Sequence, residues 1–235
     1  MKFKFIFGVL IAFTTIGCNI NTPEIPNEPS DTPTDTVSEL AKENGYDYID
    51  LGLSVKWAIC NVGAKRPEEF GDYFAWGETK PKSTYDWSTY KWCSGSYNQL
   101  TKYCTSSEYG IIDNKTNLEP SDDAATVNWG GKWRMPTIAE HEELHTKCLW
   151  VWSTQNGVQG YVITGLNKNS IFLPAAGYIE NNKGYGINDI GCYLSNSIRI
   201  NESPCPHDFC FNSEQIGWTD GFGRQFGYSI RPVLP

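Results

Sequence analysis

Three histidines and a short run of cysteines are the side chains of this sequence best suited to chemistry. His141, Glu142 and His145 form the pattern His-Glu-x-x-His. On a helix, two such histidines bind zinc from one face while the glutamate serves as a general base. A zinc-dependent hydrolase is therefore one interpretation. The pattern is also common by chance, and we expect a protein that is not an enzyme.

The second group of metal-ligand types lies at Cys205-Pro206-His207-Asp208-Phe209-Cys210. Thiolates and an imidazole suit a soft cation, but this spacing corresponds to no established metal site. Glu119, Asp122 and Asp123 are a further candidate, for calcium, and a capped turn in a solvated acidic loop explains them more simply. We therefore expect no metal and no other cofactor.

The first seventeen residues are predicted to be a lipoprotein signal peptide. Lys2 and Lys4 give a positive start, and the apolar run of residues 5–16 is too short for a membrane core, which needs about 20 residues. The run ends in Thr15-Ile16-Gly17-Cys18, which resembles a bacterial lipobox. This resemblance implies that Cys18 is lipidated and becomes the new N-terminus.

Residues 18–45 are predicted to be a disordered linker. Residues 19–39 are rich in Pro, Thr, Asn, Asp and Glu and contain almost nothing apolar, so they cannot bury enough surface to offset their ordering entropy. Such a spacer would hold a lipid-anchored domain clear of the headgroups. Asp35-Thr36-Val37 also resembles a short O-glycosylation motif of Bacteroidetes, which would place a glycan on Thr36, although so short a match arises equally well by chance.

Composition limits both the partners and the fold. Without the signal, Lys plus Arg falls from 19 to 17 against 27 Asp plus Glu, so the mature charge is −10. An acidic surface argues against binding nucleic acid and against electrostatic adhesion to anionic lipid. Residues 46–235 are enough for one well-cored domain, and abundant Gly and aromatic residues favour a loop-rich β or α+β domain.

Eight cysteines in an exported chain suggest disulfides. Two pairs are close enough in sequence to close a loop: Cys93 with Cys104, and Cys205 with Cys210. With Cys18 lipidated, seven cysteines remain, and Cys192 is the candidate for the unpaired one. Cys60 and Cys148 lie in apolar surroundings, either as buried thiols or as a long-range bridge.

Local patterns predict one helix and several strands. Thr137 and Glu140 form a capping box that begins a helix ending near Cys148, with His141, Leu144 and His145 on one face. Strands are predicted at 46–51, 55–62, 160–164, 170–178, 191–195 and 228–233. Residues 79–123 show little periodicity and should form a long loop.

The long loop is rich in aromatic residues. Trp and Tyr rings stack on sugars and pack at protein interfaces, although many rings here should belong to the core. The candidate ligand-binding rings are Tyr85, Trp87, Tyr90, Trp92 and Tyr97.

Short motifs throughout residues 46–235 together resemble a large family of Bacteroidetes lipoproteins that shares its core with the Fibrobacter succinogenes major paralogous domain. The motifs are Asp50-Leu51-Gly52-Leu53, Lys56-Trp57-Ala58, Cys60-Asn61-Val62-Gly63-Ala64, and residues 71–78, 131–137, 172–178 and 230–233. Residues 133–140 and the closing Arg-Pro-Val are also similar to segments of formylglycine-generating enzymes. These resemblances imply an α+β, C-type lectin-like domain, with a small twisted antiparallel sheet, one or two helices, and long loops that carry any binding site. His141 stands where this pattern usually has an aromatic residue.

The sequence thus predicts a non-enzymatic outer-membrane lipoprotein, on the cell-surface or the periplasmic face. Its lectin-like domain would bind a glycan or a protein ligand, or mediate adhesion. The alternatives are the zinc hydrolase and a structural module of a surface assembly.

Overall fold

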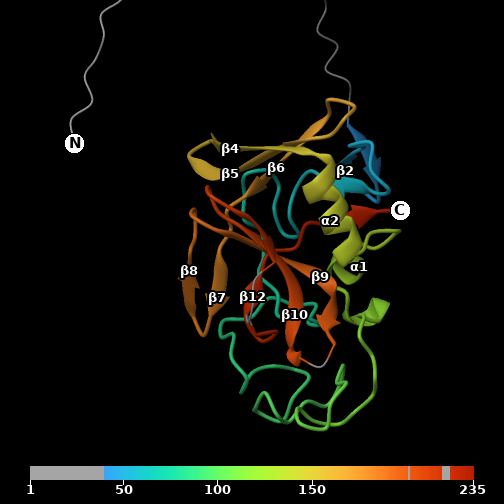
Figure 1. Cartoon of the computed structure of the whole chain (residues 1–235), viewed down its shortest axis with the longest axis vertical. Coiled ribbons are helices and arrows are strands. Elements are labelled where there is room, and N and C mark those ends of the chain that lie inside the picture. Colours follow the sequence, from blue (N-terminus) through green and yellow to red (C-terminus); the bar gives the residue numbers. More distant parts are fainter. Residues whose placement is uncertain (1–39, 201, 219–222) are drawn as a thin grey trace, which may run out of the picture. The chain divides into compact units, whose positions relative to one another are not determined.

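The computed structural model describes residues 40–200, 202–218 and 223–235 (Figure 1). The predicted signal peptide, Cys18 and Thr36 lie outside these residues. The described chain folds into small antiparallel sheets with few helices, which confirms the α+β class. No helix in these ranges is long and apolar enough to cross a membrane.

Four small sheets and three helical segments make up the described fold. The first sheet has the order β1 (Ala41–Glu43), β2 (Tyr46–Ile49), β3 (Lys56–Ala58), β13 (Val233–Leu234), and the second the order β4 (Leu149–Gln155), β5 (Val158–Thr164), β6 (Ser170–Pro174). The third sheet has the order β11 (Ile216–Trp218), β10 (Glu202–Phe211), β9 (Gly191–Arg199), and the fourth the order β12 (Gly227–Tyr228), β7 (Tyr178–Glu180), β8 (Lys183–Tyr185). The helical segments are η1 (Pro120–Asp122), α1 (Ala124–Trp129) and α2 (Ile138–Lys147).

The ordered domain begins before residue 46, so the predicted end of the linker at residue 45 is wrong. β1 pairs antiparallel with β2 through a turn at Asn44-Gly45, where φ is 49° and 87°. Asn-Gly is a preferred pair for such two-residue hairpin turns. The Trp133 indole then donates to the carbonyl of Glu43 at 2.9 Å, which ties the hairpin to the domain.

Helix α2 begins as the sequence predicts. Thr137 and Glu140 form a reciprocal capping box, in which each side chain accepts from the other residue's backbone N–H. The Arg134 guanidinium donates two hydrogen bonds, of 2.8 and 2.6 Å, to the same Glu140 carboxylate. The helix ends at Lys147 with Cys148 as its C-cap, and His141 and Leu144 are buried on one face.

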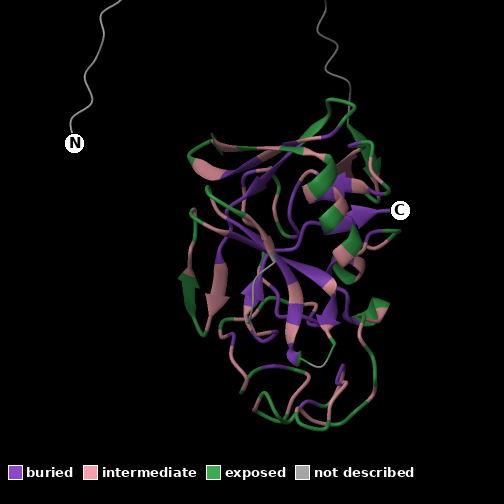
Figure 2. Cartoon of the chain, in the orientation of Figure 1, coloured by how far each residue is buried: buried purple, intermediate pink, exposed green. Residues whose placement is uncertain are grey.

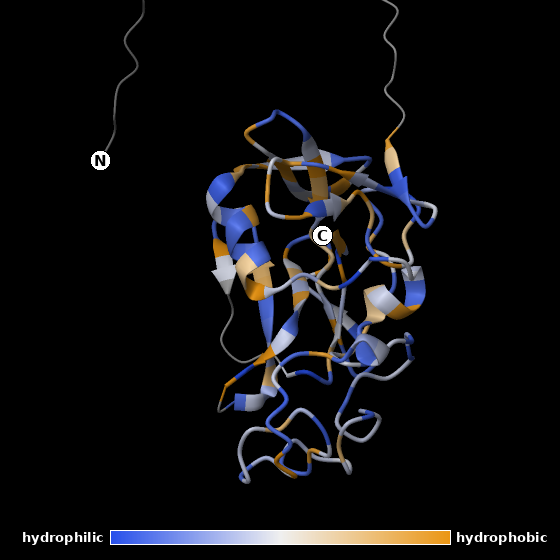
Figure 3. Cartoon of the chain, turned by 90° about the vertical axis from the view of Figure 1, so that its right-hand side faces the viewer, coloured by the Kyte–Doolittle hydropathy of each residue, from blue (hydrophilic) through white to orange (hydrophobic). Residues whose placement is uncertain are grey.

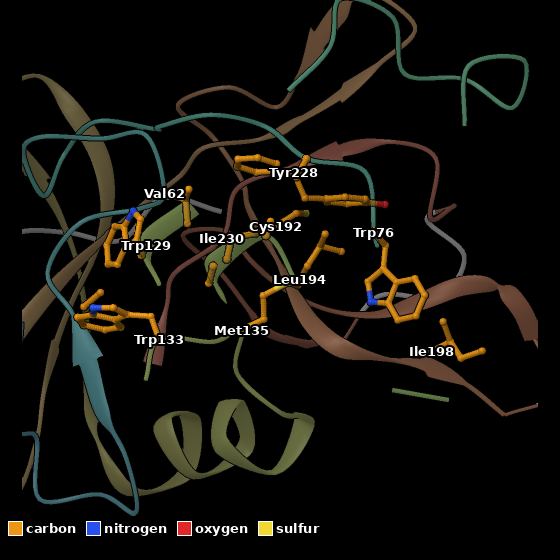
Figure 4. Close-up of a cluster of buried hydrophobic side chains, with 14 of the residues drawn as sticks. Val62, Trp76, Trp129, Trp133, Met135, Cys192, Leu194, Ile198, Tyr228 and Ile230 are labelled. Carbon is orange, nitrogen blue, oxygen red and sulfur yellow. The ribbon is translucent and has the colours of Figure 1, made fainter. Parts of the chain in front are cut away.

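The core lies on both faces of β9, whose first five residues are all buried (Figure 2). Because side chains alternate along a strand, Cys192 and Leu194 join one hydrophobic cluster and Tyr193 joins the other. The first cluster, with Trp76, Trp133 and other large rings, is drawn in Figure 4. A strand buried on both faces fixes the sheets around it.

A buried arginine joins the end of the chain to the rest of the core. The Arg231 guanidinium, 1 % exposed, donates to the side-chain oxygen of Asn61 at 2.8 Å and to the carbonyls of Ala58, Ile59 and Phe172 at 3.1, 2.7 and 3.0 Å. The closing Arg-Pro-Val motif therefore has a structural role.

The predicted cysteine pairing is wrong. The described cysteines form one disulfide, Cys192–Cys210, between residues that face each other on β9 and β10 with Cα atoms 4.3 Å apart. Cys205 lies on the same strand as Cys210, and five residues of extended chain span roughly 16 Å, so that pair cannot close. Cys93 and Cys104 do not form the predicted bridge. Both are free thiols, and each donates to a backbone carbonyl oxygen. Cys60 and Cys148 are also free thiols rather than a long-range bridge.

Candidate functional site

The long loop forms one end of the described domain. Figures 1 and 3 show that it lies at the end opposite to the point where the described chain begins. Tyr85 and Asn181 exchange backbone hydrogen bonds of 2.6 and 2.9 Å, and the N–H of Leu118 donates to Asn196 at 2.8 Å. The loop is therefore fastened to β9 and to the β7–β8 turn, and rings on its outer side are held in place.

Tyr85 and Tyr90 are not ligand-binding rings, because each is only 3 % exposed. Their hydroxyls donate to the backbone carbonyls of Tyr73 and Trp76, and burial raises the pKa of both phenols. Both rings belong to a small core cluster with Ala75 that pins the loop from below. The prediction of a binding role is wrong for these two residues.

Trp92 is half-buried and already has partners on the protein. Its indole N–H donates to the carbonyl of Gly77 at 2.8 Å. The ammonium groups of Lys91 and Lys102 lie 4.1 and 4.6 Å from the centre of its ring. Because protein cations already contact this ring, its part in ligand binding is also not supported.

Trp87 and Tyr97 are the two candidate rings that remain accessible, and we call this pair the aromatic ledge. Their ring centres lie 6.5 Å apart with planes tilted by 59°, and Tyr97 is 51 % exposed. The Trp87 ring is half-buried. Among the described residues its indole N–H has no protein acceptor, and it is not one of the polar atoms shut away from solvent. The ledge thus offers two ring surfaces and a free donor to solvent.

Contacts below the ledge hold the Trp87 ring in place. The ring meets the buried Tyr90 edge-to-face, with centres 5.7 Å apart and an angle of 88°. The Cys93 thiol donates to the Trp87 carbonyl at 3.0 Å, and the Asp86 carboxylate accepts from the N–H of Thr89 at 2.9 Å. A ring positioned in this way loses little freedom when a ligand stacks on it.

Polar residues flank the two rings along the chain. Ser88, Thr89, Asn98 and Gln99 are exposed. A hydrogen bond from the Ser88 hydroxyl lowers the pKa of Asp86, so this carboxylate is ionised at neutral pH and can accept hydrogen bonds. An apolar ring surface with donors and acceptors at its edge matches a sugar, which has an apolar C–H face and a rim of hydroxyls.

The zinc-hydrolase residues do not form a metal centre in this structure. His141 is 1 % exposed and stacks on Phe209, with ring centres 5.3 Å apart and an angle of 13°. Burial lowers its pKa to about 3. Glu142 instead faces solvent, and His145 is half-buried against Trp150. Within the described ranges no three His, Cys, Asp or Glu side chains are grouped to hold a metal ion.

The acidic residues near η1 are structural. Asp123 caps α1 by accepting from the N–H of Thr126 at 2.9 Å, which confirms the predicted capped turn. Asp122 accepts from Lys102 at 2.6 Å and from the Tyr103 hydroxyl at 2.7 Å. Because Asp122 and Asp123 are only 3 % and 5 % exposed, the prediction of a solvated acidic loop is wrong for them.

Comparison with protein-family models, with curated proteins and with solved structures finds no match for this chain. The lectin-like fold, the lipoprotein family and the lipid anchor therefore stay predictions from the sequence. The geometry of the aromatic ledge is the observation on which a function can be based.

Proposed function

We propose that this protein is a non-enzymatic cell-envelope lipoprotein whose lectin-like domain binds carbohydrate on the aromatic ledge. The single observation that carries the proposal is the solvent-accessible pair Trp87 and Tyr97, of which Trp87 packs against the buried Tyr90. Of the other three candidate rings, Tyr85 and Tyr90 are buried and Trp92 is contacted by two lysine ammonium groups.

The position of the ledge suits a tethered receptor. The described chain begins at the other end of the domain (Figures 1 and 3). A lipid on Cys18, joined through residues 19–39, would attach at that end. The ledge lies at the end of the domain opposite to this attachment point, so the anchor would leave it accessible.

The chemistry of the ledge favours a neutral or weakly charged sugar. The apolar C–H face of a sugar can stack on the face of each ring and cover it from water. The Trp87 N–H and the Asp86 carboxylate supply one donor and one acceptor for hydroxyls. A strongly anionic glycan is disfavoured, because Asp86 is ionised and the mature chain carries a charge of −10.

A glycan array probed with the unlipidated chain 19–235 tests the proposal. We expect binding by the unsubstituted chain and at least a tenfold loss of signal in the double variant W87A/Y97A. Leu166→Ala is the matched control, because Leu166 is an apolar residue on the distant β5–β6 turn and is 85 % exposed. A pull-down from a cell extract covers the alternative of a protein ligand, which the same double variant would also lose.

The array and the pull-down together separate the candidate functions. Loss of glycan binding in the double variant supports the proposal. Capture of a protein that depends on the ledge, with no glycan bound, would assign a protein ligand instead. If W87A/Y97A binds as well as the unsubstituted chain, the aromatic ledge is not the binding site.

A further inference from the structure

Strand β4 is the open edge of the β4-β5-β6 sheet. Its seven residues pair with β5 without interruption, from Leu149 opposite Thr164 to Gln155 opposite Val158. No bulge interrupts this register, and the two strands are joined by the two-residue turn Asn156-Gly157. The outer side of β4 is therefore a regular strand edge.

The register shows which backbone groups face outward. In a hairpin with a two-residue turn, the residues that flank the turn form a hydrogen-bonded pair, and bonded pairs then recur at every second residue. Gln155, Ser153 and Val151 consequently bond to β5. The N–H and C=O groups of Trp150, Trp152 and Thr154 point to the open edge, and none of them has a further backbone partner in the described chain.

β4 differs from the other sheet edges that the structure describes. β1 and β8 are three residues long and carry Lys42 and Lys183, and β11, β12 and β13 are no longer than three residues. The two longer edges, β6 and β9, consist mostly of buried residues. Folded proteins protect open edges by shortness, charge, proline or bulges. β4 has none of these features, and it exposes Leu149 by 65 % and Val151 by 49 %.

We propose that β4 pairs antiparallel with β4 of a second copy of this chain, about a two-fold axis at Trp152. In this register Trp150 faces Thr154 of the second copy, Trp152 faces its counterpart, and Thr154 faces Trp150. Each of these three pairs exchanges two hydrogen bonds, so the outward groups form six. Val151 then lies opposite Ser153, and Leu149 opposite Gln155, on the exposed face.

Charge favours a second copy at this edge over other parts of the surface. The mature chain carries a charge of −10, so two copies repel each other over most of their surfaces. Residues 149–159 contain no charged side chain, and self-pairing there places no like charges opposite each other. The interface would join two three-stranded sheets into one sheet of six strands.

The pairing would leave both aromatic ledges accessible. β4 lies at the end of the domain where the described chain begins, and the long loop lies at the other end (Figure 1). If the ledge binds sugar as proposed above, each copy in the dimer would keep its own binding site. The dimer itself does not depend on sugar binding.

Sedimentation of the unlipidated chain 19–235 over a range of concentrations tests the pairing. We expect the mass of two chains at high concentration. Thr154→Pro removes an outward N–H that β5 does not use, and Val151→Lys places a charge beside the edge, so each variant should shift the mass to one chain. Leu166→Lys is the control for an added charge at an exposed leucine, and it should remain a dimer.

Hydrogen exchange gives a second measurement that needs no variant. The amides of Trp150, Trp152 and Thr154 should exchange fast in dilute solution and at least tenfold more slowly at dimer-forming concentration. Those of Val151 and Ser153 should be protected in both. A single-chain mass at every concentration would overturn the proposal, as would a dimer whose outward amides gain no protection.

Discussion

Burial of His141 makes the stability of this domain depend on pH in a way that a single substitution should remove. The folded protein holds this imidazole between Phe209 and Trp57 and lowers its pKa from 6.5 to about 3. Between these two values the unfolded chain binds a proton that the folded chain does not. Stability from this residue is therefore complete above pH 6.5 and is lost as the pH falls toward 3.

The size of the effect follows from the same shift. At pH 5, which is 1.5 units below 6.5, proton binding by the unfolded state costs about 2 kcal/mol, at 1.36 kcal/mol per unit. His141→Phe keeps an aromatic ring in this site and removes the proton. On going from pH 7.5 to pH 5, the free energy of unfolding should fall in both proteins. We expect the fall to be about 2 kcal/mol smaller in the variant than in the unsubstituted chain.

Urea unfolding at the two pH values measures this difference. Thr146→Ala, on the exposed side of the same helix, is the control and should keep the pH dependence of the unsubstituted chain. Equal pH dependence in the unsubstituted chain and in H141F would refute the reasoning, as would an NMR titration of His141 near 6.5. A neutral, buried imidazole at His141 also explains how the His-Glu-x-x-His pattern can arise from a core side chain and not from a zinc ligand.

Two further predictions concern the core. Replacing Cys192 and Cys210 together by alanine should lower the free energy of unfolding by about 3 kcal/mol, since the disulfide closes a loop with a sequence separation of 18; chemical denaturation measures the loss, and no change would contradict a formed disulfide. Arg231→Lys should cost about 3 kcal/mol or more, because one ammonium group cannot replace the guanidinium at four buried oxygens; a thermal midpoint unchanged by this substitution would argue against the network.

Local signals in the sequence predicted local structure well. The capping box of Thr137 and Glu140 involves residues three apart, and the helix begins as it predicts. The strands predicted at 160–164 and 170–178 likewise overlap β5 and β6, which pair with each other. Helix α1, only six residues long, carries a cap at Asp123 but too short a pattern to be recognised as a helix.

Features that depend on distant contacts could not be predicted in this way. β10 contains Pro204 and Pro206, which disfavour a strand, and its pairing with β9 shifts register around Pro206. The partner of Cys210 follows from that pairing and not from spacing along the chain. The turn residues Asn44-Gly45 are typical of a hairpin. They lie within residues 18–45, where the composition instead predicted a linker.

The accessibility of the loop aromatics also depends on distant contacts, so it could not be predicted from the local sequence. Tyr90 and Tyr97 are the same residue type seven positions apart, and one is buried while the other is 51 % exposed. Tyr90 packs in the small core cluster with Ala75 and Tyr85, and its hydroxyl donates to the carbonyl of Trp76. The sequence predicted ligand-binding rings in this loop, and the fold reduced the five candidates to the two that remain accessible.

Calorimetric titration of the unlipidated chain with an array-selected oligosaccharide tests the central claim most directly. We expect saturable binding, a dissociation constant at least tenfold weaker in W87A/Y97A, and an unchanged constant in Leu166→Ala. Equal affinities for the unsubstituted chain and the double variant, with both folded, would contradict the assignment of the aromatic ledge as the binding site.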